Sequence, residues 1–293
     1  MYRIFLTGSS GFIGKNIIEI LGDRYNFLFP SSKELNLLDS SSVRQYLKKY
    51  QPDIIIHTAN VGGVRNIIDQ PGTLQKNLTM FHNLCAAKEY FNRMIVLGSG
   101  AEYDKRRGIS LIKESQFGEI TPADEYGLSK FTMSQYAEGV DFITHLRLFG
   151  VYGKYEDYKI RFISNTICKT LFDLPLTINQ NVFFDYLYIN DFVKILEYFI
   201  NNHAKEKFFN VGNGTPVDLL NIASKVISLV DKKLPITVIK KGLGNDYTCN
   251  VEKLKKEIIS LQFTEFDDTI KDLVVYYKSI LTELNKDLFL KDA

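Results

Sequence analysis

The stretch TGSSGFIG, residues 7–14, follows a short apolar run at 3–8 and opens a segment of helical periodicity at 12–23. Its three glycines are Gly8, Gly11 and Gly14. In a strand–turn–helix setting the first glycine makes the tight turn, the second lets backbone approach a pyrophosphate, and the third lets the helix pack on the strand. The N–H groups and dipole of the helix N-terminus favour that anion. This stretch therefore predicts a dinucleotide site at the first turn of a parallel α/β sheet.

Apolar runs of strand length alternate with helical segments on both sides of this turn. We expect strands at 3–8, 26–30, 53–59, 93–99 and 141–148, and helices at 12–23, 41–50, 72–91 and 125–138. Near-continuous apolar runs spaced by helices are typical of parallel strands buried on both faces. The alternation predicts an α/β fold of the Rossmann type, with a doubly wound parallel sheet.

The pattern becomes irregular after about residue 155. Helices are expected at 159–171, 191–202, 216–230 and 267–284, and short strands at 183–189, 208–211 and 236–239. We interpret residues 1–155 as an NAD(P)-binding domain that also receives 181–212. Residues 156–180 and 213–293 would then form a smaller C-terminal α/β lobe that binds the substrate.

Composition excludes several classes of partner. The 293 residues include 36 Lys plus Arg and 34 Asp plus Glu, a net charge of +2, so nothing favours nucleic acid or an anionic membrane. Cys85, Cys168 and Cys249 form no CxxC pair, and the four histidines form no HxxxH pattern, so no metal site is expected. No apolar run approaches the roughly 18 residues of a membrane span. With no signal peptide in the pattern, we expect a cytoplasmic protein.

The end of the second strand bears on cofactor choice. NAD sites usually place an acid there, on the ribose hydroxyls. In FLFPSSKE (27–34) the turn carries Ser31, Ser32 and Lys33, whose hydroxyls and positive charge suit a 2′-phosphate. This favours NADP over NAD. Glu34 comes a few residues later in the sequence, and the geometry of the loop could still place its carboxylate on the ribose hydroxyls of NAD.

EYGLSK (125–130) places Tyr126 and Lys130 four residues apart on one face of an expected helix. A phenol has an ordinary pKa of about 10, and a neighbouring ammonium lowers that pKa. The pair could therefore act as a general acid/base near neutral pH. Ser99, at the end of the 93–99 strand, could hold a substrate oxygen against the phenol. We take Ser99, Tyr126 and Lys130 as the candidate catalytic set. The structural alternative is a helix-face tyrosine and a solvated lysine.

Together these motifs resemble the extended short-chain dehydrogenase/reductases, which are mostly enzymes that act on nucleotide-sugars. The shared features are TGxxGFIG, Asp39 in LNLLDSS, HTAN (57–60), the serine after the fourth strand and YxxxK. The resemblance continues through RLFGVYG (147–153), FDYLYINDF (184–192) and FNVGNGTPVDL (209–219), and so covers nearly the whole chain. It implies an NAD(P)-dependent oxidoreductase. It also implies a homodimer through the 72–91 and 125–138 helices.

The resemblance also implies roles for single residues. Asp39 would contact the adenine, Ala59 would lie along the cofactor, Lys130 would also hold the nicotinamide ribose, and Asn77 would steady the Lys130 region through water. The complete expected cofactor set is Gly8, Ser10, Gly11, Phe12, Ile13, Gly14, Ser31, Ser32, Lys33, Leu38, Asp39, Ala59, Asn77, Tyr126, Lys130 and Phe149.

Within this family, KELNLLDSSSV (33–43) and ANVGG (59–63) are similar to the GDP-fucose synthases. Those enzymes carry a cysteine where this chain has Ala101, and their histidine falls near Arg161, so double epimerisation is not expected. Sugar 4,6-dehydratases carry an acid pair where this chain has Gly100 and Ala101. With these two reactions set aside, the expected chemistry is hydride transfer at a carbon that bears oxygen.

Two chemistries fit hydride transfer. The favoured one is NADPH-dependent reduction of the C4 keto group of a nucleotide-linked 4-keto-6-deoxy sugar, in surface polysaccharide precursor synthesis. A nucleotide-sugar 4-epimerase with tightly bound NAD stays open. A non-catalytic dinucleotide sensor or scaffold would typically have lost the Tyr or Lys of YxxxK. Candidate substrate-binding residues are Val61, Gly62, Gly100, Ala101, Arg147, Arg161 and Phe184. Among them the two arginines are candidate phosphate contacts, and Phe184 could stack on a ring or simply belong to an apolar strand face.

Overall fold

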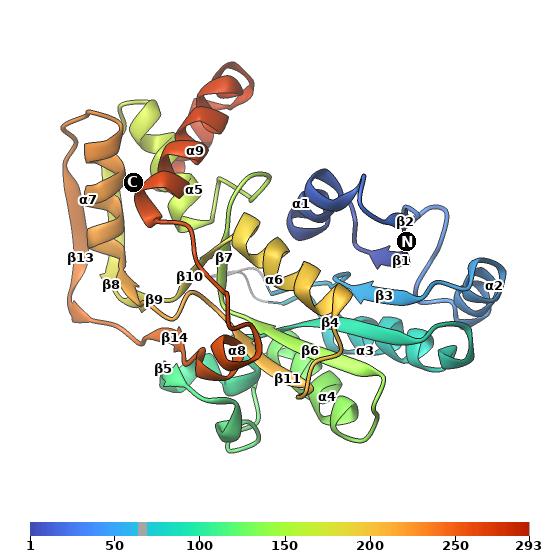
Figure 1. Ribbon diagram of the computed structural model, residues 1–293. Coiled ribbons are helices and arrows are strands. Elements are labelled where there is room, and N and C mark those ends of the chain that lie inside the picture. The colour runs from blue at the N-terminus through green and yellow to red at the C-terminus, as the bar shows by residue number, and fades with distance from the viewer. Residues whose placement is uncertain (64–68, 293) are drawn as a thin grey trace.

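The computed structural model describes residues 1–63 and 69–292, and its centre is a six-stranded parallel sheet (Figure 1). The strand order is β11-β6-β4-β3-β1-β2. These strands are β1 (Arg3–Thr7), β2 (Asn26–Leu28), β3 (Ile54–His57), β4 (Arg93–Ser99), β6 (Ile143–Leu148) and β11 (Phe208–Val211). The order reverses direction beside β1, so the sheet is doubly wound as the sequence predicts.

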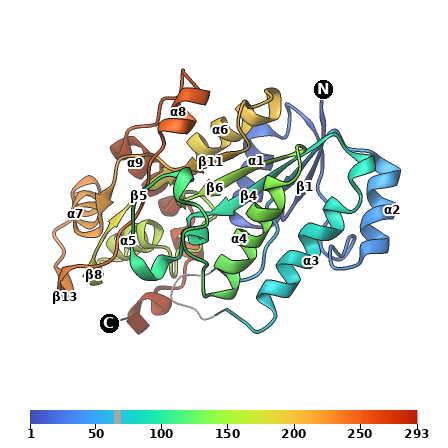
Figure 2. The same cartoon turned by 90° about the horizontal axis from the view of Figure 1, so that it is seen from below.

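Helices cover both faces of this sheet. α2 (Ser40–Tyr50), α3 (Thr73–Cys85) and α4 (Glu125–Glu138) lie side by side on one face (Figure 2), and α1 (Phe12–Leu21) and α6 (Ile189–Asn201) pack together on the other. Side chains alternate along β3, so Ile54 and Ile56 join one apolar core and Ile55 joins the other. This alternation explains why the strands are apolar without interruption.

The second lobe packs three helices beside a two-stranded sheet. The helices are α5 (Phe162–Leu171), α7 (Leu219–Leu229) and α9 (Phe266–Ser279), and the strands are β8 (Leu176–Asn181) and β13 (Ile236–Leu243). This lobe lies at the left of Figure 1. A parallel pair of β7 (Gly150–Tyr152) and β10 (Tyr186–Tyr188) leads toward it, and the short α8 (Glu252–Glu257) packs near β11.

A small four-stranded sheet connects the two parts of the chain. Its order is β12-β9-β14-β5, formed by β12 (Val217–Asp218), β9 (Phe183–Phe184), β14 (Tyr247–Cys249) and β5 (Ile109–Ile112). β5 follows the fourth strand of the central sheet, whereas β14 comes from the C-terminal part. The pairing therefore carries C-terminal residues to the end of β4, where Ser99 lies.

Several boundaries differ from the sequence prediction. The helix expected over 72–91 ends at Cys85, and Lys88–Tyr90 form a separate turn of 3₁₀ helix. The strand expected over 183–189 is divided at Asp185, because β9 pairs with β12 and β14 in the small sheet whereas β10 pairs with β7. β5, β7, β8, β12 and β14 were not predicted.

Two larger expectations remain predictions. β11 pairs with β6 in the central sheet, as the proposed return of 181–212 requires, but the division into domains is untested. α3 and α4 pack together within the chain, and their use in a homodimer concerns a second copy. In the described part of the chain no helix is long and apolar enough to cross a membrane.

Candidate active site

At the turn between β1 and α1, the backbone packs too closely for a side chain at Gly8 or Gly14. Gly8 has a φ of +69°, and a Cβ there would lie 2.6 Å from Thr58 Oγ1. A Cβ on Gly14 would lie 2.3 Å from the carbonyl oxygen of Gly8. No side chain caps the first turn of α1, whose N-cap is Gly11, so its N–H groups are available to a diphosphate. These residues fit the dinucleotide that the sequence predicts.

Two threonines join the ends of β1 and β3 beneath this turn. Thr7 Oγ1 accepts the N–H groups of Thr58 and Ala59, both at 3.1 Å, and Thr58 Oγ1 donates to the Thr7 carbonyl at 2.6 Å. Because Thr7 Oγ1 already accepts twice, its proton goes to His57 Nδ1 at 2.9 Å. Burial lowers the pKa of His57 to about 3, so this ring is neutral. These hydrogen bonds between the ends of β1 and β3 hold Ala59 beside Gly8, where the cofactor is expected.

The turn after β2 carries both signs of charge. Ser31, Ser32 and Lys33 are exposed there, as a 2′-phosphate site requires. Glu34 Oε2 accepts the N–H of Ser31 at 2.7 Å, so the Glu34 carboxylate also lies at this turn. That backbone hydrogen bond lowers the pKa of Glu34. Nearby, Asp39 caps α2 by accepting from Ser41 N at 3.0 Å, and Leu38 is exposed beside it.

Ser99, Tyr126 and Lys130 lie together at the end of β4. Ser99 is the last residue of that strand, and its hydroxyl lies close enough to Tyr126 to lower the pKa of that phenol. Asp124 caps α4 through Gly127 N at 2.8 Å, which places Tyr126 in the first turn of the helix. Lys130 Nζ donates to the Leu97 carbonyl at 2.8 Å and lies 5.8 Å from the centre of the Tyr126 ring. The geometry therefore joins the three predicted catalytic side chains.

The electrostatics of the set differ from the expectation. Burial raises the pKa of Tyr126, against the opposing effects of the Ser99 hydrogen bond and the Arg161 charge. Burial also lowers the pKa of Lys130 to about 8, and Glu102 acts in the other direction. The ammonium is turned toward Leu97, so Arg161 is the cation that favours the Tyr126 phenolate. At neutral pH the phenol keeps its proton.

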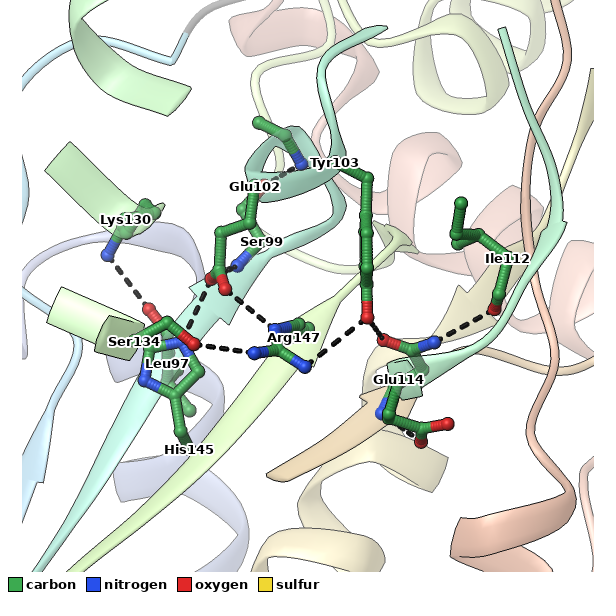
Figure 3. Close-up of polar contacts among 12 residues, drawn as sticks. Leu97, Ser99, Glu102, Tyr103, Ile112, Glu114, Lys130, Ser134, His145 and Arg147 are labelled. Carbon is green, nitrogen blue, oxygen red and sulfur yellow. Dashed lines mark hydrogen bonds and ion pairs between the residues drawn. The ribbon is translucent and has the colours of Figure 1, made fainter. Parts of the chain in front are cut away.

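A buried carboxylate lies directly behind the catalytic set (Figure 3). Glu102 Oε1 accepts the Ser99 N–H at 2.9 Å and faces His145 Nε2 at 2.8 Å, while Glu102 Oε2 accepts Arg147 Nε at 2.7 Å. Burial alone would raise the pKa of Glu102, but its partners hold it at about 2. Burial lowers the pKa of His145, so the charged partner of Glu102 at neutral pH is Arg147.

Arg147 therefore does not lie where a substrate phosphate contact is needed. It is 1% exposed, and two of its other N–H groups go to Ser134 Oγ at 2.6 Å and Tyr103 Oη at 3.3 Å. Tyr103 in turn donates to Asn210 Oδ1 at 2.7 Å, and Asn210 Nδ2 donates to the Ile112 carbonyl at 2.9 Å (Figure 3). The guanidinium belongs to a buried network around Glu102, which accepts the Ser99 N–H, and it is not exposed as the expected phosphate contact would need to be.

The loop after β3 packs onto Tyr126. Asn77 is buried, its Oδ1 accepts the Val61 N–H at 2.8 Å, and its Nδ2 donates to the Val61 carbonyl at 2.9 Å and to Ser129 Oγ at 3.2 Å. These are direct contacts to loop and helix, whereas the expected role used water. Asp69 accepts from Gly63 N at 3.0 Å and Tyr126 N at 2.9 Å. No motif marked Asp69 as a site residue.

Aromatic rings form the wall opposite Ser99. Gly100 leaves space for two of them, since a Cβ there would lie 2.6 Å from Tyr247 Oη and 2.8 Å from the Phe149 ring. Phe184 is 7% exposed and stacks on Tyr186 with ring centres 5.3 Å apart, so it is mainly part of an apolar strand face. Tyr247 was missed, because a three-residue strand far along the chain gives no recognisable pattern.

The remaining predicted residues border this site or its cofactor turn. Arg161 is exposed at the N-cap of α5, with its charge acting on Tyr126. Ala101 is 1% exposed, and Gly62 has a φ of +76° beside Asp69. Ser10, Phe12 and Ile13 lie at the start of α1. Among the residues that the structure describes, no three His, Cys, Asp or Glu side chains gather as a metal site.

Comparisons with known proteins agree with this geometry. The model of the NAD dependent epimerase/dehydratase family matches residues 4–212. The chain is 29% identical to a GDP-L-colitose synthase of Yersinia pseudotuberculosis over 83% of this chain and 89% of that protein. A UDP-glucose 4-epimerase of Thermotoga maritima superposes with a TM-score of 0.81 at 19% identity, covering 95% of this chain and 99% of that one. A GDP-mannoheptose C4 reductase of Campylobacter jejuni, solved with NADP, superposes with a TM-score of 0.79 at 18% identity, covering 94% and 98%.

The family match spans most of the chain, including the glycine turn, Ser99 and the Tyr126–Lys130 pair. The chain belongs to the NAD dependent epimerase/dehydratase family and is an NAD(P)-dependent oxidoreductase of the extended short-chain dehydrogenase/reductase type.

Proposed function

We propose that the protein uses NADPH to reduce the C4 keto group of a nucleotide-linked 4-keto-6-deoxy sugar. The observation that carries this proposal is the composition of the site. Two hydroxyls, from Ser99 and Tyr126, meet at the end of β4, while Gly100 and Ala101 supply no acid or thiol for a further proton transfer. Reduction of a ketone needs one hydride and one proton, and this set can deliver the proton.

Each side chain of the site has a separate role in that reduction. The nicotinamide supplies the hydride when the dinucleotide is bound. Ser99 and Tyr126 hold the keto oxygen, and Tyr126 gives its proton to the oxygen as negative charge develops there. The raised pKa of Tyr126 keeps it protonated at neutral pH and so favours its use as the acid. Lys130 has three N–H donors, of which one goes to Leu97, leaving the others for the nicotinamide ribose.

The names of relatives support a GDP-linked substrate as the first to test. The curated relatives include a GDP-L-colitose synthase and, over a shorter segment, a GDP-L-fucose synthase of Azorhizobium caulinodans. Two solved structures of similar fold are named as a GDP-mannoheptose C4 reductase and a GDP-6-OMe-4-keto-L-xylo-heptose reductase. The exposed Arg161, close enough for its charge to act on Tyr126, is our candidate contact for the substrate diphosphate.

One observation favours a second function, a nucleotide-sugar 4-epimerase that keeps NAD bound. The Glu34 carboxylate lies at the Ser31 amide, where it would repel a 2′-phosphate and could accept ribose hydroxyls instead. An epimerase oxidises and re-reduces the same carbon, so it needs no side chain beyond the set described here.

Purified protein incubated with NADPH and a freshly made GDP-4-keto-6-deoxy sugar distinguishes the two functions. Loss of NADPH absorbance, with one reduced sugar formed per NADPH consumed, is the expected result. No consumption with GDP-, dTDP-, UDP- or CDP-linked keto sugars, together with NAD⁺ retained through purification, would refute the reductase and favour the epimerase.

The assignment of Tyr126 has a matched control on the same helix. Tyr126→Phe should lower turnover about a hundredfold or more, because it removes the proton donor, while cofactor binding followed by fluorescence stays close to wild type. Tyr136→Phe changes a partly exposed phenol of α4 outside the site and should leave turnover unchanged. Near-normal activity in Tyr126→Phe would show that another group delivers the proton.

A further inference from the structure

Asp69 joins the loop after β3 to the first turn of α4. Its Oδ1 accepts the Gly63 N–H at 3.0 Å, and its Oδ2 accepts the Tyr126 N–H at 2.9 Å. Gly63 and Tyr126 belong to different elements and lie far apart in the sequence. One carboxylate, with both of its oxygens used, therefore fixes the place of the one backbone segment relative to the other.

The first turn of α4 receives two carboxylates on consecutive N–H groups. Asp124, the residue before the helix, accepts the Gly127 N–H at 2.8 Å, and Asp69 accepts the Tyr126 N–H. The first N–H groups of a helix have no partner inside the helix, and helix ends fray where such groups lack acceptors. The negative charges also suit the positive end of the helix dipole. Asp69 therefore stabilises the turn that carries the proposed proton donor.

The Tyr126 carbonyl is tied to the same loop. Ser129 Oγ donates to this carbonyl at 2.7 Å and accepts Asn77 Nδ2 at 3.2 Å. Asn77 Oδ1 in turn accepts the Val61 N–H at 2.8 Å. The loop after β3 therefore acts on the Tyr126 main chain through both its N–H and its C=O.

The ring of Tyr126 rests against this loop as well. Gly63 has a φ of +75°, and a Cβ there would lie 2.6 Å from Tyr126 Cε2 and 2.7 Å from Tyr126 Cζ. Glycine is therefore needed at this position both for the left-handed backbone and for the space beside the ring. Because Asp69 holds the N–H groups of both residues, the ring and the surface against which it lies have a common anchor.

We propose that Asp69 is a positioning residue for the reaction: its carboxylate fixes Gly63 and the Tyr126 main chain relative to each other and so sets the place of the Tyr126 phenol. Asp69 itself transfers no proton, because its two oxygens accept main-chain N–H groups. A reacting group misplaced by about 1 Å can lose about a hundredfold in rate, so an anchor on the main chain of the proton donor affects turnover. The kinetic consequence rests on the proposed reduction, whereas the placement of the Tyr126 ring does not.

Two substitutions of Asp69 give a graded test. Asp69→Ala removes both hydrogen bonds and should lower kcat about tenfold or more, with KM for NADPH close to wild type. Asp69→Asn keeps one oxygen that can accept, so its kcat should fall between those of Asp69→Ala and wild type. The solvent deuterium isotope effect on kcat should rise in both variants, because a displaced phenol delivers its proton more slowly.

Glu125→Ala is the matched control. Glu125 Oε2 accepts the Leu74 N–H at 2.8 Å in the first turn of α3, so this variant also removes a carboxylate from a helix N-terminus where α3 and α4 pack together. It should lower the urea unfolding midpoint, as Asp69→Ala does, and leave kcat and the isotope effect unchanged. A role of Asp69 in stability alone predicts that the two variants lose activity equally.

A pair of glycine variants tests the ring contact with Asp69 intact. Gly63→Ala would place a Cβ against the Tyr126 ring, whereas the Cβ of Gly72→Ala, at a φ of +84°, would meet none of the described atoms within 4 Å. Both substitutions strain a left-handed backbone, so the contact with the ring is the difference between them. The ring is followed by ¹³Cζ-tyrosine NMR of the full-length protein, with the Tyr126 signal identified by its absence in Tyr126→Phe. This signal should shift in Gly63→Ala and Asp69→Ala, and stay in place in Gly72→Ala and Glu125→Ala.

The two proposals fail in different ways. If wild-type protein consumes no NADPH with keto sugars but the Tyr126 signal shifts in Asp69→Ala and Gly63→Ala and in neither control, the positioning role stands and the reductase does not. If neither variant shifts the signal, if a control shifts it equally, or if Glu125→Ala lowers kcat as much as Asp69→Ala, the positioning role of Asp69 is refuted.

Discussion

Replacing Glu102 by glutamine should destabilise the protein by about 3 kcal/mol at neutral pH. The carboxylate is fully buried and accepts from Ser99 N, Arg147 Nε and His145 Nε2. Its pKa is lowered from an ordinary 4.5 to about 2. The gap between these two pKa values corresponds to about 3 kcal/mol of stability. Removing one partner of a buried ion pair independently suggests about 3–5 kcal/mol, because Arg147 keeps its charge without a counterion.

The pH dependence has a defined sign. The native pKa of Glu102 is depressed, so its contribution is complete above the unfolded value near 4.5 and is lost as pH falls toward about 2. The stability difference between wild type and Glu102→Gln should therefore be about 1 kcal/mol smaller at pH 3.5 than at pH 7.

Urea unfolding at both pH values, followed by circular dichroism, measures these differences. Glu89→Gln is the matched control, because it removes the carboxylate of an exposed pair with Arg44 and should cost roughly 0–1 kcal/mol. If Glu102→Gln lost no more stability than Glu89→Gln at an unchanged m-value, the buried ion pair would not be the support for Ser99 that we describe.

Three further outcomes follow from other parts of the chain. Gly14→Ala should abolish cofactor binding and lower the free energy of unfolding by about 1–3 kcal/mol, measured by thermal unfolding, because its Cβ would collide with backbone atoms. The control is Gly139→Ala, whose Cβ would have a single contact at 3.6 Å and should change stability by no more than about 0.5 kcal/mol. Burial raises the pKa of Glu156 to about 7, so the free energy of unfolding of wild type should fall as pH rises from 4.5 to 7. The stability of Glu156→Gln relative to wild type should therefore be about 3 kcal/mol greater at pH 8 than at pH 4.5. A stability difference that is equal at both pH values would contradict this. Glu34→Gln should raise the NADPH to NADH ratio of kcat/KM several-fold and Lys33→Ala should lower it, and a ratio unmoved by either would place the 2′ position elsewhere.

The central sheet was predictable because its information is local. Each element can be recognised from its own residues, as with the apolar runs at 54–57 and 93–99 and the helical periodicity at 12–21. α4 was predicted with its observed ends, since Asp124 before it and Gly139 after it mark both caps. The glycine turn was recognisable for the same reason: each glycine is required by neighbours within the same motif or the adjacent strand.

The rest of the site depends on long-range pairing. Ser99 was found from its place at a strand end, and the spacing of Ser99 and Glu102 is that of a local capping box, which was not predicted. The other partners of Glu102, His145 and Arg147, come from β6, and no local pattern predicts them. The expected effect of Lys130 on Tyr126 assumed helix geometry alone and missed the Leu97 carbonyl across the helix–sheet contact. Strands of two or three residues such as β12 and β14 have no periodicity to detect.

The connecting sheet makes the two parts of this chain chemically interdependent. The family match ends at residue 212, before β14 begins. A chimera that joined residues 1–212 to a relative's C-terminal part would import a different strand beside β5, and with it a different side chain against Gly100. Exchange of such parts would therefore alter the residues around the end of β4 as well as the second lobe itself.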